Sequence, residues 1–253
     1  MTTSVVIGGT SGIGSVITSN LINRGDEVYT VSRRNSLSTN HICCDISSDC
    51  SVLIDLIPRV DYLIFAHRYR GDDWSQTFDV TLKGVDNVIK AISNKLNKES
   101  SVVMISSNAS QFIFTEQPAQ YHSSRAALEG LMRYYAVVYG KNHVRFNCIL
   151  PASLIKPENL DFFTKNNKVR KLIENITPLG RMGRAEDIAN IVMFLCSSKS
   201  AFLTGNSFMV DGGLSLVGQE SIARNLENLN HCLLYTSDAA DDLLCVDLGG
   251  RRI

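Results

Sequence analysis

The chain has 253 residues, of which 44% are hydrophobic and 20% are charged, a composition typical of one soluble α/β domain. Lysine plus arginine and aspartate plus glutamate both number 25, so the formal net charge is zero and indicates neither nucleic acid nor an anionic membrane as a partner. No apolar run reaches the roughly 20 residues of a membrane span, and no secretion signal opens the chain, so we expect a cytoplasmic protein. The seven cysteines form no CxxC pair or His/Cys cluster, so we expect no metal site and no disulfide framework.

Strand-like and helix-like segments alternate along the chain. The first strand is predicted at residues 5–7, and a helix with apolar residues at helical spacing follows it and ends at Gly25. Further strands are predicted at residues 28–31, 41–44, 62–65, 101–107, 144–150 and 207–210. Further helices are predicted at residues 52–57, 78–96, 123–139 and 188–195. This alternation predicts an α/β fold, a single doubly wound parallel sheet with helices on both faces.

Four glycines lie between the first strand and the first helix, in the sequence VVIGGTSGIG. A helix N-terminus offers free N–H groups and a partial positive charge, and both suit a pyrophosphate. Glycine lets the phosphate and the helix approach closely because it has no Cβ. The spacing GxxxGxG is wider than the common GxGxxG, and glycine-rich turns also occur without a ligand. The candidate cofactor-binding residues of this turn are Gly8, Thr10, Ser11, Gly12, Ile13 and Gly14.

The residues after the second strand favour NADP(H) over NAD(H). Ser32 stands where an acidic residue would bind a ribose 2′-hydroxyl, and Arg33 and Arg34 follow it. A guanidinium binds a 2′-phosphate through charge-assisted hydrogen bonds, whereas a carboxylate repels it. Asp45, after the third strand, is a candidate acceptor for the adenine amino group, and capping of the following helix is the alternative.

Three stretches of this chain are similar to a known family: GGTSGIG, YHSSRAALEGL and PLGRMGRAEDIANIVMFLCSSKSAFLTGNSFMVDGG. From about residue 4 to residue 217 the chain resembles the classical short-chain dehydrogenases/reductases. The resemblance implies a Rossmann-type domain over residues 1–230 and hydride transfer between a nicotinamide cofactor and a carbonyl or alcohol substrate. It also implies assembly as a homodimer or homotetramer.

The resemblance assigns catalytic roles to Ser107, Tyr121 and Arg125. Tyr121 is expected to donate or accept the proton, so its pKa must lie below the usual value of about 10. Ser107 is expected to bind the substrate oxygen, with Ser106 and Ser110 as alternatives in ISSNAS. Cofactor contacts are also expected at Ala66 and Pro151, and at Tyr121 and Arg125 themselves.

The chain departs from the family pattern at several positions. Arg125 replaces the family lysine, which contacts the nicotinamide ribose and lowers the tyrosine pKa. Thr81 replaces an asparagine that supports a proton-relaying water. The segment FAHR replaces Asn-Asn-Ala-Gly, Pro151 is followed by alanine instead of glycine, and Lys156 replaces a threonine. Arginine keeps the positive charge of lysine, but its planar fork points differently.

Three functional interpretations therefore remain. The first is an active NADP(H)-dependent oxidoreductase with a modified proton relay. The second is an NADP(H)-binding homologue that has lost catalysis and acts as a sensor or partner subunit. The third, which the glycine turn and Arg33 disfavour, is a substrate- or lipid-binding module without a nucleotide.

Two further segments bear on the substrate. In AHRYRGDDW, His67, Arg68 and Arg70 follow a strand at the edge where ligands bind, so an acidic substrate group is one possible partner. A solvated loop with Arg70 near Asp72 or Asp73 is the favoured alternative. In the family, the region of residues 156–175 is a mobile lid over the substrate.

The last 22 residues, 232–253, resemble the translation of a transposase-type sequencing-library adapter, with CLLYTS followed by DAADD. We therefore expect a non-native tail after residue 230, the alternative being a genuine extension.

Overall fold

A seven-stranded parallel sheet forms the centre of the molecule. The computed structural model describes residues 1–36, 40–165 and 167–227. The strands, in spatial order β3-β2-β1-β4-β5-β6-β9, are all paired in parallel. Their bounds are β1 (Thr3–Ile7), β2 (Glu27–Ser32), β3 (His41–Cys43), β4 (Val60–Phe65), β5 (Leu96–Ile105), β6 (Arg145–Pro151) and β9 (Ser207–Val210). The strand order reverses direction between β1 and β4, where doubly wound sheets bind their ligands.

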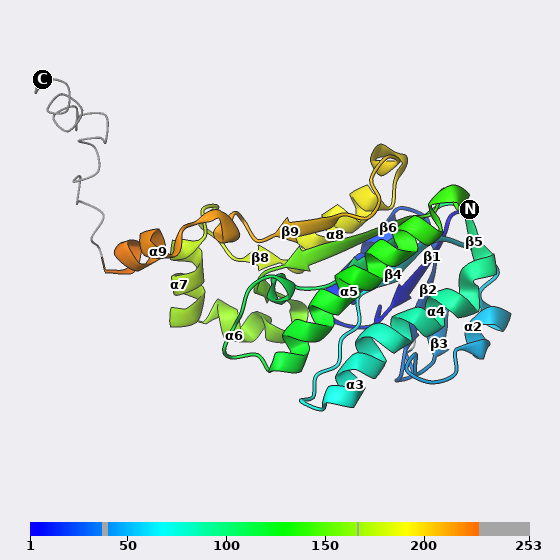
Figure 1. The fold of residues 1–253 in the computed structure, drawn as a ribbon, viewed down its shortest axis with the longest axis horizontal. Helices are drawn as coiled ribbons and strands as arrows, with labels where there is room; N and C mark the ends of the chain where they lie inside the picture. The colour runs from blue at the N-terminus through cyan, green and yellow to red at the C-terminus, as the bar shows by residue number, and fades with distance from the viewer. Residues whose placement is uncertain (37–39, 166, 228–253) are drawn as a thin grey trace, which may run out of the picture.

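Helices cover both faces of the sheet. One face packs against α4 (Gly84–Ile92) and α5 (Ala119–Val138), which lie in front of the sheet in Figure 1, and against α2 (Ser51–Leu56). The other face packs against α1 (Gly12–Asn23) and α8 (Ala185–Leu195). Each face buries its own apolar cluster, because a parallel sheet covered on both sides has strands that are apolar throughout, as in VVI of β1. The predicted fold class is confirmed.

The prediction of one long helix over residues 78–96 is wrong in its bounds and in its continuity. The segment starts earlier, with α3 (Trp74–Phe78), because the Asp73 carboxylate accepts a hydrogen bond from the Gln76 amide and caps that end. A π-helical turn, Asp79–Lys83, then interrupts the helix before α4 begins, so Thr81 lies in irregular backbone. Residue 96 already belongs to β5.

Three other boundaries near the site also differ from the prediction. β5 ends at Ile105, so Ser107 follows the strand rather than ending it. Helix α5 begins at Ala119 instead of residue 123, which places Tyr121 in its first turn. Pro151 is the last residue of β6, paired with Val210, rather than a residue beyond the strand.

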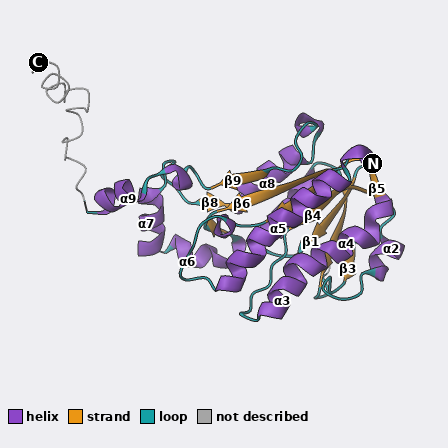
Figure 2. Ribbon diagram, in the orientation of Figure 1, coloured by secondary structure: helices purple, strands orange, loops and turns teal. Residues whose placement is uncertain are grey.

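The region between β6 and α8 contains short elements that periodicity did not predict. They are β7 (Leu154–Ile155), α6 (Leu160–Thr164), α7 (Lys168–Ile176) and β8 (Gly183–Arg184), and α9 (Gln219–Leu226) follows β9. Figure 2 shows α6, α7 and α9 grouped beyond the carboxyl end of β9, away from the main helical layers. Among the described residues, no helix combines the length and apolarity needed to cross a bilayer.

Candidate functional site

The turn between β1 and α1 can exist only with glycine at its key positions. Gly8 has φ +81°, and a Cβ there would lie 2.8 Å from the backbone of His67. A Cβ on Gly14 would lie 2.1 Å from the carbonyl oxygen of Gly8, so this glycine lets α1 pack directly against the end of β1. Gly12, with φ +56°, opens the helix in a conformation that side chains disfavour.

A cleft of about 730 Å³ runs along the carboxyl ends of β1, β2 and β4. It brings together most of the predicted cofactor-binding residues: Gly8, Thr10, Ser11, Gly12, Ile13, Ser32, Arg33, Arg34, Asp45 and Ala66. Four predicted cofactor contacts, Gly14, Tyr121, Arg125 and Pro151, are not among its lining residues. A dinucleotide fits this donor set, because the cleft offers glycine backbone at a helix N-terminus and guanidinium groups beyond it.

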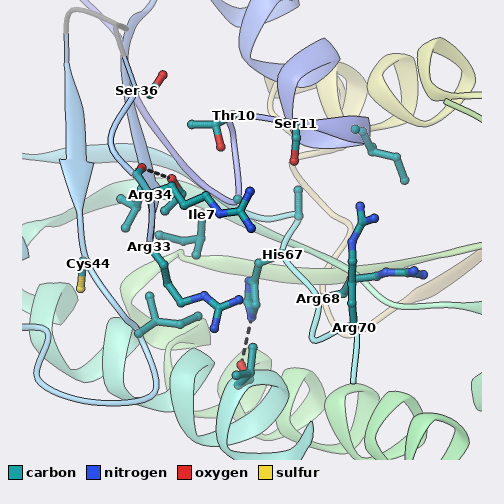
Figure 3. Close-up of a pocket in the computed structure, with 18 of the residues that line it drawn as sticks. Ile7, Thr10, Ser11, Arg33, Arg34, Ser36, Cys44, His67, Arg68 and Arg70 are labelled. Atoms are coloured by element: carbon teal, nitrogen blue, oxygen red, sulfur yellow. Dashed lines mark hydrogen bonds between the residues drawn. The ribbon is translucent and has the colours of Figure 1, made fainter. Parts of the chain in front are cut away.

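The two arginines after β2 lie at one end of the cleft. Figure 3 shows Arg33 and Arg34 on one side of His67, with Arg68 and Arg70 on the other. The Ser32 hydroxyl donates to the carbonyl of Arg34 at 2.9 Å, which fixes the turn that carries both guanidinium groups. Arg33 and Arg34 are exposed and form no ion pair with any described carboxylate. They can therefore accept an anionic ligand without losing a partner.

Asp45 does not cap helix α2. Its carboxylate accepts from the Ser47 amide at 3.1 Å and from the Ser47 hydroxyl at 2.7 Å. These bonds keep the pKa of Asp45 below its ordinary value, with Arg33 contributing as well. The capping alternative is thus wrong, since Asp49 bonds to the first residue of α2 instead. Asp45 remains a cleft residue.

His67 joins the cleft to the π-helical turn. Its Nε2 lies 3.0 Å from the carbonyl oxygen of Val80, whereas its Nδ1 is buried without a hydrogen-bond partner. Burial lowers the pKa of His67 to about 4, so the ring is neutral near pH 7 and donates from Nε2. Because π-helical turns leave carbonyl groups outside the regular hydrogen-bond pattern, His67 supplies a donor that this turn needs.

Tyr121 and Arg125 lie one turn apart on α5. The guanidinium carbon of Arg125 is 5.2 Å from the centre of the Tyr121 ring. Arg125 is only 3% exposed, its Nη1 donates to the carbonyl of Ile105 at 3.2 Å, and its Nε has no partner. A buried cation thus lies against the phenol and is anchored to the end of β5.

The electrostatics of this pair favour an ionisable phenol. Burial raises the pKa of Tyr121, whereas the positive charge of Arg125 and hydrogen bonding to Ser107 lower it. The lowering effects together exceed the effect of burial, so the pKa lies below its ordinary value. Arg68 and Lys156 add smaller contributions of the same sign. The positive charge that the family supplies with lysine is therefore present here in a guanidinium.

Of the three candidate serines, Ser107 is the one beside Tyr121. Its hydroxyl accepts from the Ala109 amide at 3.1 Å, which orients the side chain. Ser106 donates to the carbonyl of Arg125, and Ser110 donates to the carbonyl of Ser107. Both alternatives are therefore engaged with backbone carbonyl groups.

A second cavity of about 350 Å³ is lined in part by Tyr121. It shares Arg68 and Arg70 with the cleft and is otherwise lined by residues of the loop after β4, by Thr77 and by Gln117, Pro118 and Gln120. Tyr121 therefore lines a small cavity that adjoins the nucleotide-sized cleft through Arg68 and Arg70, so the phenol is suitably placed to meet a substrate there.

The pairing expected for Arg70 is wrong. Arg70 does not bind Asp72 or Asp73 but forms an ion pair with Glu158, at 3.1 Å between Nη2 and Oε1. Glu158 lies in a short turn, Pro157–Asn159, and sequence reasoning had given it no role. Glu158 is a cleft residue that the sequence analysis did not select, whereas His67, a candidate contact for an acidic substrate group, also lines the cleft. Arg68 and Arg70 were the signal available for Glu158, because guanidinium groups bind carboxylates through charge-assisted hydrogen bonds.

The described residues hold no group of histidine, cysteine or carboxylate side chains that could bind a metal ion. The five described cysteines are free. The candidate site is therefore built from a glycine turn, arginines and one tyrosine.

Comparison with known proteins shows which family the chain resembles. Residues 65–215 match a family model described as enoyl-(acyl carrier protein) reductase. The chain is 29% identical over 244 residues to a 3-oxoacyl-(acyl-carrier-protein) reductase of Rickettsia felis, covering 85% of this chain and 97% of that protein. It is 33% identical to an L-rhamnose 1-dehydrogenase (NAD(P)(+)) of a Sphingomonas species, although that match spans only 55% of either chain.

Solved structures agree with these relatives. A short-chain type dehydrogenase/reductase from Mycobacterium ulcerans superposes with a TM-score of 0.76 and 26% identity, covering 85% of this chain and 90% of that one. The aldohexose dehydrogenase of Thermoplasma acidophilum superposes with a TM-score of 0.75 and 25% identity, covering 86% of this chain and 96% of that one.

Proposed function

Since the chain belongs to the short-chain dehydrogenase/reductase family of oxidoreductases, we propose that it transfers a hydride between NADP(H) and a carbonyl or alcohol substrate. The observation that carries this proposal is the contact between the Tyr121 phenol and the buried guanidinium of Arg125, beside the glycine-lined cleft. When bound, the nicotinamide supplies the hydride. The residues of this chain bind, orient and exchange a proton.

In the reducing direction, the Tyr121 hydroxyl donates its proton to the substrate oxygen. Arg125 stabilises the phenolate that remains, because a buried positive charge favours the ionised form. Ser107 orients the substrate oxygen through its hydroxyl, and the Ala109 amide fixes that hydroxyl. In the oxidising direction the same phenolate accepts the proton.

The preference for NADP(H) rests on Arg33 and Arg34. Both guanidinium groups lie at the end of the cleft beyond Ser32, and neither is paired with a described carboxylate. We expect Arg33→Met to weaken NADPH binding about tenfold and to leave NADH binding unchanged within a factor of about two. Parallel fluorescence titrations with the two cofactors measure this ratio. Equal losses for both cofactors would contradict the assignment.

An NADP(H)-binding homologue without catalysis is the second candidate. The observation in its favour is that Arg125 is bonded to Ile105 and has an orphaned Nε, so it is a poor relay for protons. Turnover separates the two functions. The wild-type protein and Tyr121→Phe are mixed with NADPH and a panel of aldehydes and ketones. Oxidation of NADPH that the Tyr121→Phe variant loses supports the enzyme, whereas tight NADPH binding with no turnover of any panel member supports the second candidate.

Assembly as a homodimer or homotetramer and residence in the cytoplasm are part of the proposal. The support for assembly is that Tyr134, Val137 and Val138 on α5 are exposed apolar or aromatic side chains. Light scattering of the purified protein tests the assembly.

A further inference from the structure

The carboxylate of Glu158 lies in the glycine turn, where the first turn of α1 begins. A Cβ placed on Gly12 would be 2.7 Å from Glu158 Oε1, 3.1 Å from Oε2 and 3.3 Å from Cδ. The whole carboxylate group therefore lies directly over the Gly12 backbone. Gly12, Ser11 and Glu158 all line the same cleft.

Helix α1 has no acidic side chain of its own at this end. Its N-cap residue, Ser11, makes no side-chain capping bond, and the first turn contains no aspartate or glutamate. The free N–H groups and the partial positive charge of a 12-residue helix thus face the cleft. The carboxylate that lies at this helix end belongs instead to Glu158, more than a hundred residues further along the chain.

Arg70 binds the same carboxylate. Its Nη2 lies 3.1 Å from Glu158 Oε1, and the two side chains remain 60% and 30% exposed. An ion pair this exposed contributes little to folding stability, so its exchange for another anion costs little. Figure 3 shows Arg70 in the cleft beside Arg68, on the side of His67 away from Arg33 and Arg34.

A carboxylate and a phosphate present the same chemistry to such a site, because both are oxyanions that accept from backbone N–H groups and from guanidinium. We propose that Glu158 occupies the position of a cofactor phosphate in the free protein, and that Arg70 exchanges Glu158 for that phosphate when the dinucleotide binds. The identity of the ligand as a dinucleotide rests on the proposed function.

The exchange predicts opposite effects for its two partners. Glu158 competes with the phosphate, so removing its charge strengthens binding. Arg70 assists the phosphate, so removing its charge weakens binding. If Glu158 instead served only to orient Arg70 for the cofactor, removing the Glu158 charge would weaken binding, so the sign of this one effect distinguishes the two roles.

Calorimetric titration of the full chain tests the exchange with three probes. They are NADPH, inorganic pyrophosphate and adenosine 2′-phosphate, which has no diphosphate to place at α1. We expect Glu158→Gln to tighten NADPH and pyrophosphate about threefold or more and to leave adenosine 2′-phosphate unchanged. We expect Arg70→Met to weaken NADPH about fivefold or more. Asp161→Asn, which removes a carboxylate from neighbouring α6 outside the cleft, is the matched control and should change nothing.

The outcomes separate this inference from the proposed function. Unchanged or weaker NADPH and pyrophosphate binding by Glu158→Gln overturns the exchange, even where NADPH binds well. Equal tightening by Asp161→Asn, or equal tightening toward adenosine 2′-phosphate, also overturns it, because the effect would then be general electrostatics. If Glu158→Gln tightens pyrophosphate binding but the protein binds no NADPH, the result supports the exchange of Glu158 for an anion and contradicts the proposed cofactor. A protein that binds none of the three probes contradicts both.

Discussion

At the scale of single residues, Arg125 is the substitution that most affects the chemistry. Its charge is the largest influence that lowers the pKa of Tyr121 against the opposing effect of burial. Removing it with Arg125→Met leaves burial to dominate, so the phenol pKa rises. Oxidation of an alcohol requires the phenolate, and its pH profile should therefore move to higher pH by about one unit or more.

The pH dependence of kcat/KM for alcohol oxidation measures this shift, and Arg125→Lys is the matched control. Lysine keeps the charge, so its profile should stay closer to that of the wild type than the profile of Arg125→Met. A pH profile that is the same in all three proteins would show that Arg125 does not tune the phenol.

His67 makes a separate prediction about stability. Its folded pKa is about 4 against an ordinary value of 6.5, so the unfolded chain binds the proton more readily than the folded protein. The contribution of His67 to stability is therefore fully present above pH 6.5 and is lost as the pH drops toward 4, by an amount on the order of 3 kcal/mol. His67→Gln keeps a donor near the carbonyl of Val80 without the titration, so its urea-unfolding free energy should change less over this window.

The carboxylates with lowered pKa values do not obscure this window. Asp45, Asp187 and Asp211 have folded pKa values below 3.8, so the stability they contribute is lost only as the pH falls through and below that value. Equal slopes for the wild type and His67→Gln between pH 4 and 6.5 would contradict the neutral, buried histidine.

At the scale of elements, the contact between β1 and α1 depends on Gly14. A Cβ there meets the backbone oxygen of Gly8 at 2.1 Å, and a backbone atom cannot rotate away as a side chain can. We expect Gly14→Ala to destabilise the protein by about 1–3 kcal/mol and to weaken NADPH binding as α1 is displaced. Gly130→Ala on α5 is the control, since a Cβ there meets nothing within 4 Å. It should be stabilising by about 0.5–1 kcal/mol in chemical denaturation. Equal effects of the two substitutions would show that α1 does not pack against β1 this closely.

The sequence predicts the sheet and its covering helices well, because β1 and β4 are largely apolar runs and α1 and α8 carry apolar residues at helical spacing. It fails where local pattern does not decide the backbone. The π-helical turn at Thr81 has ordinary helical spacing, and what distinguishes it is the bond from His67, which comes from another element. Helix α7 does have apolar residues at helical spacing, Val169, Leu172, Ile173 and Ile176, which the sequence analysis did not use, whereas the five-residue α6 is too short to show a period.

The same limit applies to the candidate site. Tyr121, Arg125 and the glycine turn are recognisable because their spacing along the chain is short. Arg70 and Glu158 are 88 residues apart, and proximity along the chain favours Asp72 and Asp73 as partners of Arg70 instead. Only the folded chain brings the turn at Pro157–Asn159 to the cleft.

At the scale of the whole molecule, both apolar clusters and the cleft are complete within residues 5–210 of the described chain. Residues 232–253, the proposed non-native tail, lie outside the residues that the structure describes. We expect a chain that ends at residue 230 to melt within about 2 °C of the full chain and to bind NADPH equally well. Differential scanning calorimetry of the two chains measures this. A substantially lower melting temperature for the shorter chain would show that the tail belongs to the protein.

The central claim is hydride transfer from NADPH with Tyr121 as the proton donor, and deuterium transfer tests it most directly. The protein is incubated with NADPH deuterated at the transferable position and with the carbonyl panel, and the product alcohols are analysed by mass spectrometry. The account predicts one deuterium at the former carbonyl carbon with the wild-type protein, and a rate at least about 10²-fold lower with Tyr121→Phe. Bound NADPH that delivers no deuterium to any panel member, or equal rates for the two proteins, would contradict it.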